Sequence, residues 1–263
     1  MSGAVVLRSA LFNLAFYLNF IVWLLVAVPT LVMPRHAIIA VVKAWGRVNL
    51  WLLRVICGID VEWRGLEKIP PGQLLVAAKH QSAWETFALL SLFSDPTFIL
   101  KRELMWLPLF GWLAHKAGMI PVDRSAGKDA LGAMTRAFRA ALAEGRQVII
   151  FPEGTRRPPE AEPSYKLGIL FLYAGGQAPC LPIALNSGLF WERRGFLRYP
   201  GTIRVEVLDP IPPGLSRRVF FRRLQGDIET ATAALIAQGR RELGEAAPPT
   251  AGAAANPSAN RAR

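Results

Sequence analysis

The feature that most constrains the fold is a regular alternation of short apolar runs with longer helical patterns between residues 61 and 243. Apolar and β-branched runs of strand length, separated by amphipathic segments, are typical of α/β proteins. We therefore predict an α/β fold with a mixed, largely parallel sheet flanked by helices. The expected strands are 61–65, 74–78, 97–100, 119–122, 147–151, 180–185 and 202–207, and the expected helices are 84–93, 128–143, 165–174 and 216–243.

A long uncharged segment precedes this region. Residues 9–34 contain no Asp, Glu, Lys or Arg, and a helix of this length can cross a hydrocarbon core of about 30 Å. Asn13, Asn19 and Pro29 within it are unfavourable for an ideal span. Spanning the bilayer and lying in its interface both remain open.

Residues 36–57 form a second apolar helical pattern, in which Lys43, Arg47 and Arg54 alternate with Trp45 and Trp51. Basic residues beside tryptophans indicate an interfacial amphipathic helix. The excess of basic residues after the first segment places the rest of the chain on the cytoplasmic face of the inner (plasma) membrane. The alternative is a pair of buried core helices.

These boundaries predict three parts. Residues 1–58 form a membrane-associated helix pair, residues 59–244 an α/β domain, and residues 245–263 an Ala- and Pro-rich tail. The composition of the tail cannot supply a hydrophobic core, so we expect it to be disordered.

The net charge of +12 and the hydrophobic fraction of 52% limit the classes of partner. Such a chain suits an anionic lipid surface or a phosphorylated substrate. Nucleic acid is not expected, because the sequence contains no recognisable reader motif. Cys57 and Cys180 lie far apart in apolar contexts and are interpreted as buried thiols of a reducing compartment.

His80 is the first candidate for chemistry, because it stands between an expected strand and an expected helix, where α/β folds place ligands. Glu85 lies five positions later. If His80 is in the loop and Glu85 in the first helical turn, the carboxylate can orient the imidazole. The alternative is structural, because Ser82 and Glu85 also form a capping-box pattern.

A second candidate follows the expected strand 147–151. Its loop reads Phe-Pro-Glu-Gly-Thr-Arg, in which Gly154 allows close approach of a ligand, Thr155 offers a hydroxyl and Arg156 a planar guanidinium for phosphate. Further cations, Lys101 and Arg124, lie at the ends of two other strands. Each of these groups could instead be an ordinary solvated charge.

Two kinds of site are not indicated. No serine or cysteine stands in a nucleophile elbow, and no His, Cys or carboxylate cluster has metal-ligand spacing. A base without its own nucleophile suggests that the substrate supplies a hydroxyl. The cations suggest that this substrate carries a phosphate, and the apolar N-terminal region suggests that it is a lipid.

Four blocks in this order resemble the glycerolipid acyltransferase family. They are His80-x4-Glu85, where the family usually has Asp in place of Glu; residues 101–103 with 118–124; Phe151 to Arg156, matched at every position; and the surroundings of Pro182. The N-terminal helix pair also looks like the membrane-docking element of bacterial members.

The resemblance implies transfer of a fatty acyl group from an acyl thioester to the 2-hydroxyl of 1-acylglycerol 3-phosphate, producing phosphatidic acid for phospholipid synthesis. His80 would be the general base and Glu85 would orient it. The residues implied to bind the phosphorylated acceptor are Lys101, Arg124, Glu153, Gly154, Thr155 and Arg156.

No metal or prosthetic group is implied. The acyl donor would be a thioester of coenzyme A or of acyl carrier protein, and the sequence leaves this choice open. Two alternatives also remain: the same chemistry on another lysolipid, such as a lyso-ornithine lipid, or a non-catalytic protein that binds anionic lipid.

Overall fold

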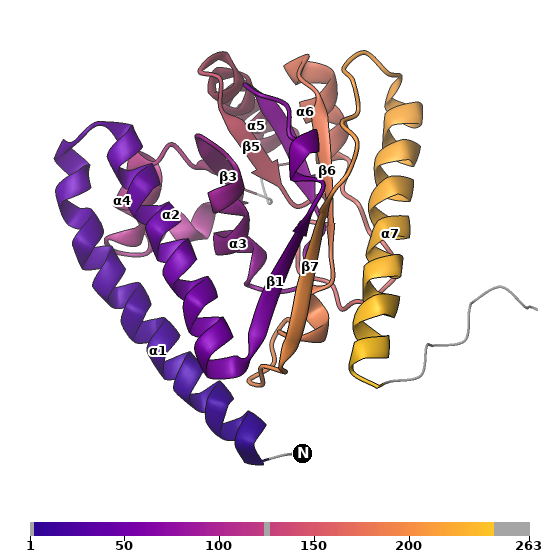
Figure 1. The fold of residues 1–263 in the computed structure, drawn as a ribbon. Coiled ribbons are helices and arrows are strands. Elements are labelled where there is room, and N and C mark those ends of the chain that lie inside the picture. Colours follow the sequence, from indigo (N-terminus) through magenta and orange to yellow (C-terminus); the bar gives the residue numbers. More distant parts are fainter. Residues whose placement is uncertain (1–2, 124–126, 245–263) are drawn as a thin grey trace, which may run out of the picture.

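The structure is a computed structural model, and it describes residues 3–123 and 127–244 (Figure 1). Arg124 and the tail 245–263, both named above, lie outside the described residues.

The centre of the molecule is a seven-stranded sheet with the order β1-β7-β6-β2-β5-β3-β4. All neighbouring pairs are parallel except β6 and β7, so β1 and β7 run against the other five. The sheet is therefore mixed and mostly parallel, as predicted. Its strands are β1 Ile59–Arg64, β2 Leu74–Ala78, β3 Pro96–Lys101, β4 Ile120–Val122, β5 Gln147–Ile150, β6 Cys180–Leu185 and β7 Gly201–Val207.

Helices cover both faces of this sheet, and each face has its own core. Successive strand residues point to opposite faces. Val76 thus packs with Phe12 and Phe87 on one side, whereas Leu75 packs with Phe138 and Phe220 on the other. The first side is covered by α1 Gly3–Ala27, α2 Arg35–Leu52, α3 Glu85–Ala88 and α4 Phe110–Lys116, and the second by α5 Gly127–Ala143, α6 Gly168–Gly176 and α7 Arg217–Glu242. Burial on both faces explains why β2 is apolar at every position.

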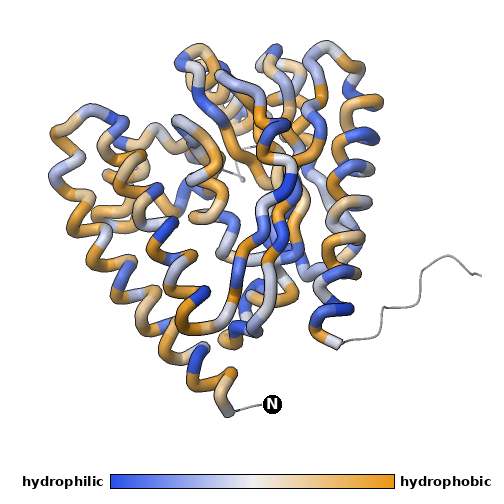
Figure 2. The backbone as a smooth tube through the Cα atoms, viewed as in Figure 1, coloured by the Kyte–Doolittle hydropathy of each residue, from blue (hydrophilic) through white to orange (hydrophobic). Residues whose placement is uncertain are grey.

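Helix α1 packs along the outside of the molecule beside α2 (Figure 1). With the short 3-10 turn Val28–Val32 it forms the one stretch, within the described parts of the chain, that is long and apolar enough to cross a membrane. Its outward face carries exposed apolar side chains such as Leu7, Leu18 and Leu25. Most of the helix is in the hydrophobic colours of Figure 2. An exposed apolar face of this extent is typical of membrane-associated proteins.

The inner face of α1 is attached to the α/β domain by polar contacts. Ser9 Oγ accepts a hydrogen bond from the Arg198 backbone N–H at 2.8 Å, and Asn13 Oδ1 accepts one from the Arg198 guanidinium at 3.0 Å. Asn19 donates to Asn49 of α2 at 3.1 Å. The asparagines that are unfavourable for an ideal membrane span therefore bind protein groups.

Some predicted elements differ from the observed ones. The expected helix 84–93 is only the short α3 followed by a 3-10 turn over Leu89–Leu92. The expected helix 36–57 ends as a π-helical turn over Leu53–Cys57 before the left-handed Gly58. Helix α4 was not predicted, because its seven residues are too few to show a helical period.

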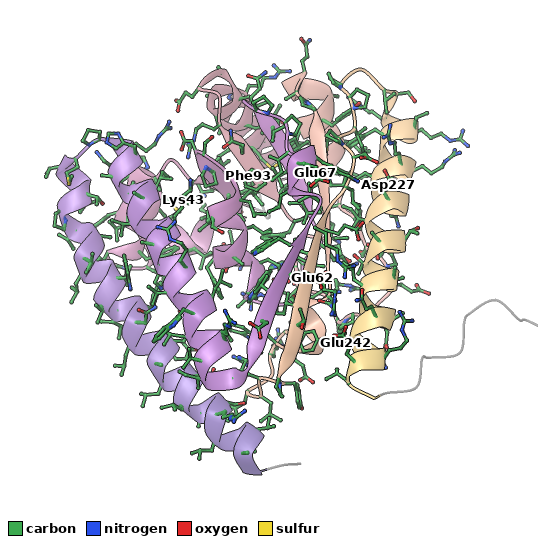
Figure 3. All side chains as sticks on the ribbon, in the orientation of Figure 1. Lys43, Glu62, Glu67, Phe93, Asp227 and Glu242 are labelled. Carbon is green, nitrogen blue, oxygen red and sulfur yellow. The ribbon has the colours of Figure 1, made fainter. Side chains whose placement is uncertain are left out.

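The edge formed by β1 and β7 is joined to α7 by one buried cation. Arg204 of β7 pairs with Glu62 of β1 at 2.8 Å and with Glu242 at the end of α7; both carboxylates are labelled in Figure 3.

Cys57 and Cys180 are both buried and free, as predicted. Burial raises the pKa of the Cys57 thiol to about 11.

Candidate active site

The candidate site lies at the carboxyl ends of two neighbouring parallel strands, β2 and β5. His80 follows β2 by two residues, and the loop 151–157 follows β5 directly. The Arg157 backbone N–H donates to the His80 carbonyl at 2.8 Å and joins the two loops. Parallel strands bring segments that are distant in sequence to one edge, which is where such sheets place their ligands.

The His80 imidazole faces the Glu85 carboxylate, as the spacing predicted. Nδ1 of His80 lies 3.4 Å from Oε2 of Glu85, and the Glu85 side chain is completely buried. The two groups are not well aligned for a hydrogen bond, and within the described residues Nδ1 has no other partner. The carboxylate therefore lies beside the ring without a well-formed hydrogen bond to it.

Glu85 also carries out the structural role considered as its alternative. Its carboxylate accepts hydrogen bonds from the backbone N–H of Gln81 at 3.2 Å, from that of Ser82 at 3.1 Å and from the Ser187 hydroxyl. Ser82 Oγ in turn accepts from the Trp84 backbone N–H at 3.0 Å. The carboxylate therefore holds the loop around His80 and also lies beside the ring, so the structural contacts are compatible with the predicted orienting role.

A Glu85→Gln protein is expected to lose both activity and stability. The amide would turn a donor towards backbone N–H groups that need an acceptor, and it would remove the negative charge beside His80. Leaving a buried donor unsatisfied costs about 1–3 kcal/mol. Urea denaturation and assays of the acyl transfer implied by the resemblance would measure the two effects, and near-full activity with only a loss of stability would contradict the orienting role.

One face of the His80 imidazole is covered by an aromatic ring. Phe151 stacks on His80 with ring centroids 3.8 Å apart and planes 12° from parallel. Phe151 in turn stacks on Phe98 of β3 at 5.7 Å. The imidazole plane is therefore set by packing.

His80 lines a cavity of about 880 Å³ that has two chemically distinct regions. One region lies between the helices that cover this face of the sheet and is almost entirely apolar. The other lies beside the loop 151–157 and contains charged and polar groups. The apolar region is lined by Phe20, Trp23, Val41, Trp45, Phe98, Phe110, Leu113 and Met119, among others, and the polar region by Lys101, Glu153, Gly154, Thr155, Arg156 and Lys166.

Five of the six predicted substrate-binding residues therefore line one cavity with His80: Lys101, Glu153, Gly154, Thr155 and Arg156. Lys101 is half-exposed and paired with Glu103 at 2.9 Å. Gly154 has a φ of 66°, which strongly favours glycine at this position. The sixth residue, Arg124, belongs to the part of the chain that the structure does not describe.

Comparison with known proteins assigns the family. A family model described as "Acyltransferase" matches residues 60–186. The chain is 39% identical over 209 residues to the 1-acyl-sn-glycerol-3-phosphate acyltransferase of Pseudomonas aeruginosa, which covers 79% of this chain and 81% of that protein. The chain belongs to the acyltransferase family.

Two further proteins are similar to this chain, one named for a different acceptor and one of known structure. The chain is 28% identical over 199 residues to the lyso-ornithine lipid O-acyltransferase of Pseudomonas aeruginosa, which covers 69% of this chain and 76% of that protein. The crystal structure of the 1-acyl-sn-glycerophosphate acyltransferase of Thermotoga maritima superposes with a TM-score of 0.70 over 87% of this chain and 97% of that one, at 21% identity. Its fold is the mixed, mostly parallel sheet with flanking helices described above.

The candidate site contains a buried ion cluster that sequence reasoning missed. The Lys79 side chain is 1% exposed, and its ammonium lies 3.2 Å from Glu153 Oε1 and 2.8 Å from Glu229 Oε1. Tyr165 donates a hydrogen bond to Glu229 at 2.9 Å. Burial raises the pKa of the Glu153 carboxyl, and attraction to Lys79 opposes this rise. Lys79 thus connects the loop carrying His80 to the loop after β5 and to α7.

Two further residues of the candidate site gave no signal in the sequence. The Arg193 guanidinium donates to Thr155 Oγ1 at 3.1 Å and adds a cation beside the polar region. Ser187, at the end of β6, binds Glu85. Both belong to the connection between β6 and β7, whose proximity to His80 depends on sheet order and not on any local motif.

Proposed function

We propose that this acyltransferase moves a fatty acyl group from an acyl thioester to the 2-hydroxyl of 1-acylglycerol 3-phosphate and so forms phosphatidic acid for phospholipid synthesis. The observation that carries the proposal is a single cavity that brings together His80 with its buried carboxylate, separate cations and an extended apolar wall. A lipid with a phosphate and a reactive hydroxyl has this combination of groups.

In the proposed mechanism His80 acts as general base. Its Nδ1 faces Glu85, which leaves Nε2 to remove the proton from the acceptor hydroxyl. The hydroxyl oxygen forms a bond to the thioester carbonyl carbon, the C–S bond breaks, and the proton passes from His80 to the departing thiolate. Glu85 stabilises the imidazolium that exists between the two proton transfers. No acyl-enzyme forms, because the nucleophile belongs to the acceptor.

The phosphate of the acceptor would bind in the polar region of the cavity. Arg156 and Lys101 supply charge there, Thr155 supplies a hydroxyl, and Gly154 allows the backbone to approach the ligand closely. Glu153 has a side chain only 1% exposed and holds this loop through Lys79. We retain Arg124 as a further phosphate ligand from its place in the motif.

The acyl donor is a co-substrate, and the reaction is proposed to need no metal or prosthetic group, because His80 activates the acceptor hydroxyl and a thiolate is a good leaving group. The donor thioester carries either coenzyme A or acyl carrier protein. Both are acidic and suit a chain with a net charge of +12.

We further propose that α1 lies in the membrane interface on the cytoplasmic side. Contacts of Ser9, Asn13 and Asn19 with the domain and with α2 run along one side of α1, while apolar side chains cover the other side. A helix attached in this way cannot cross the bilayer without taking the domain with it. This position would place the cavity beside its lipid substrate.

An Arg156→Gln protein tests the acceptor assignment. A charged hydrogen bond contributes about 1.5–3 kcal/mol, so we expect kcat/KM for 1-acylglycerol 3-phosphate to fall by about 10- to 100-fold. The rate with the dephosphorylated acceptor should not change. Arg222→Gln, an exposed change on α7, is the matched control. Equal losses with both acceptors would mean that Arg156 does not bind the phosphate.

A second candidate acceptor is a lyso-ornithine lipid, because a relative named for that reaction shares 28% identity with this chain. The chemistry at His80 would be the same, but the acceptor would have no phosphate. Acylation of lyso-ornithine lipid that does not depend on Arg156 would favour this candidate.

A further inference from the structure

A second apolar surface lies outside the N-terminal helices, on the segment 104–112 between β3 and the middle of α4. Residues 104–114 contain no charged side chain. Four large apolar residues of the segment are exposed: Leu104 by 39%, Trp106 by 69%, Leu107 by 49% and Trp112 by 66%. Two tryptophans so exposed within seven residues are unusual on a surface that faces water.

The opposite side of this segment is packed against the membrane-associated helices. Leu113 of α4 and Ala117, the residue after α4, share a small core with Ala27 of α1 and with Ile38 and Ile39 of α2. Phe110 of α4 contacts Phe20 of α1, with ring centroids 6.3 Å apart. The exposed side of the segment is therefore next to the N-terminal helices.

The apolar region of the cavity lies between these same elements. Its walls include Phe20 and Trp23 from α1, Leu104 at the start of the segment, and Phe110 and Leu113 from α4. Trp106 and Trp112 are not among the residues that line it. They point outward beside the cavity, so they are free to contact something other than the substrate.

Charge does not explain the exposed surface. The two cations that precede the segment are already paired, Lys101 with Glu103 at 2.9 Å and Arg102 with Asp123 at 2.9 Å, and the segment itself carries no charge. A partner for this segment must therefore be recognised mainly by apolar contact. Tryptophan beside charged residues is the composition that settles at the boundary between headgroups and acyl chains.

We propose that the segment 104–112 is a second membrane-contacting element, and that its partner is the same lipid surface that receives α1. The cavity would then open between two inserted elements, so the acyl chain of a lipid substrate could enter without crossing water. The inference rests on the proposed membrane docking of α1 and adds a contact that lies about 50 residues beyond the end of α2 in the sequence.

The test places an environment-sensitive thiol label at Trp106→Cys in the full chain. The native thiols do not interfere, because Cys57 and Cys180 are buried and burial raises the pKa of both. Leu18→Cys on the exposed face of α1 and Arg222→Cys on α7 carry the same label as controls. The probe is a vesicle of phosphatidylcholine and phosphatidylglycerol.

We expect the labels at positions 106 and 18 to shift to shorter wavelength and brighten several-fold with vesicles, and the label at 222 not to change. The shift at 106 should persist at about 1 M salt, where charge attraction is screened within about 3 Å. An aqueous label at 106 beside a shifted label at 18 would overturn the inference and leave the docking of α1 intact. No shift at either position would overturn both.

A second copy of the chain is the competing occupant. In that case the label at 106 would shift with protein concentration in the absence of vesicles, which would also overturn the inference. A variant with Trp106→Asp and Trp112→Asp provides an independent readout. It should bind vesicles several-fold more weakly than an Arg222→Asp control and acylate vesicle-borne lysolipid more slowly. Both variants should acylate lysolipid dissolved in detergent micelles at the same rate.

Discussion

A His80→Ala protein is expected to remain folded and to lose about 10²- to 10⁴-fold of its acyl-transfer rate, the usual contribution of a general base. The loss arises because the imidazole is held in a catalytic orientation on two sides, by Glu85 at 3.4 Å and by the stacked Phe151 ring. Steady-state kinetics with a labelled acyl thioester would measure the loss, and circular dichroism would verify folding.

His36→Ala is the matched control for this prediction, because His36 is exposed at the start of α2 and is not among the residues that line the cavity. Its rate should stay close to that of wild type. If the two alanine variants were equally active, His80 would not be the base, and the chemistry assigned to this cavity would have to be abandoned.

A Lys79→Met protein is expected to lose about 3–5 kcal/mol of its free energy of unfolding, because removing one partner of a buried ion pair leaves a buried charge without compensation. Glu153 is 1% exposed and Glu229 is 24% exposed, so water cannot replace the ammonium at Glu153. Denaturation by urea would measure the loss. Activity should also fall, since Lys79 supports both loops of the site.

The control is Lys68→Met, which removes the surface pair between Lys68 and Asp209. These side chains are 35% and 77% exposed, and such a pair contributes at most about 1 kcal/mol. If Lys79→Met were no less stable than Lys68→Met, the buried cluster would not be the support of the site that we infer.

The main outline of the fold and of the site could be predicted because parallel strands impose it. Each apolar run that ends in a polar motif places that motif at the same edge of the sheet. The proximity of His80 after β2 to the loop 151–157 after β5 can therefore be predicted without knowing how the intervening chain folds. The Glu85 contact followed from the same local argument, because the residue lies in the first turn of α3.

The features that were missed depend on contacts between residues distant in sequence. Lys79 precedes His80 directly, but its partner Glu229 lies 150 positions later on α7, and no spacing rule connects them. Arg193 reaches Thr155 only because of the sheet order. The segment 104–112 escaped notice because its four exposed apolar residues show no helical or strand period, and their exposure is a property of the folded chain.

The central claim is that this cavity acylates a phosphorylated lysolipid, and acceptor choice by the wild-type protein tests it most directly. Membranes containing the protein would be given a labelled acyl thioester with 1-acylglycerol 3-phosphate, its dephosphorylated analogue or a lyso-ornithine lipid. We expect transfer to the first acceptor and little to the other two. Transfer to an acceptor without phosphate at an equal or higher rate would contradict the roles given to Arg156 and Lys101.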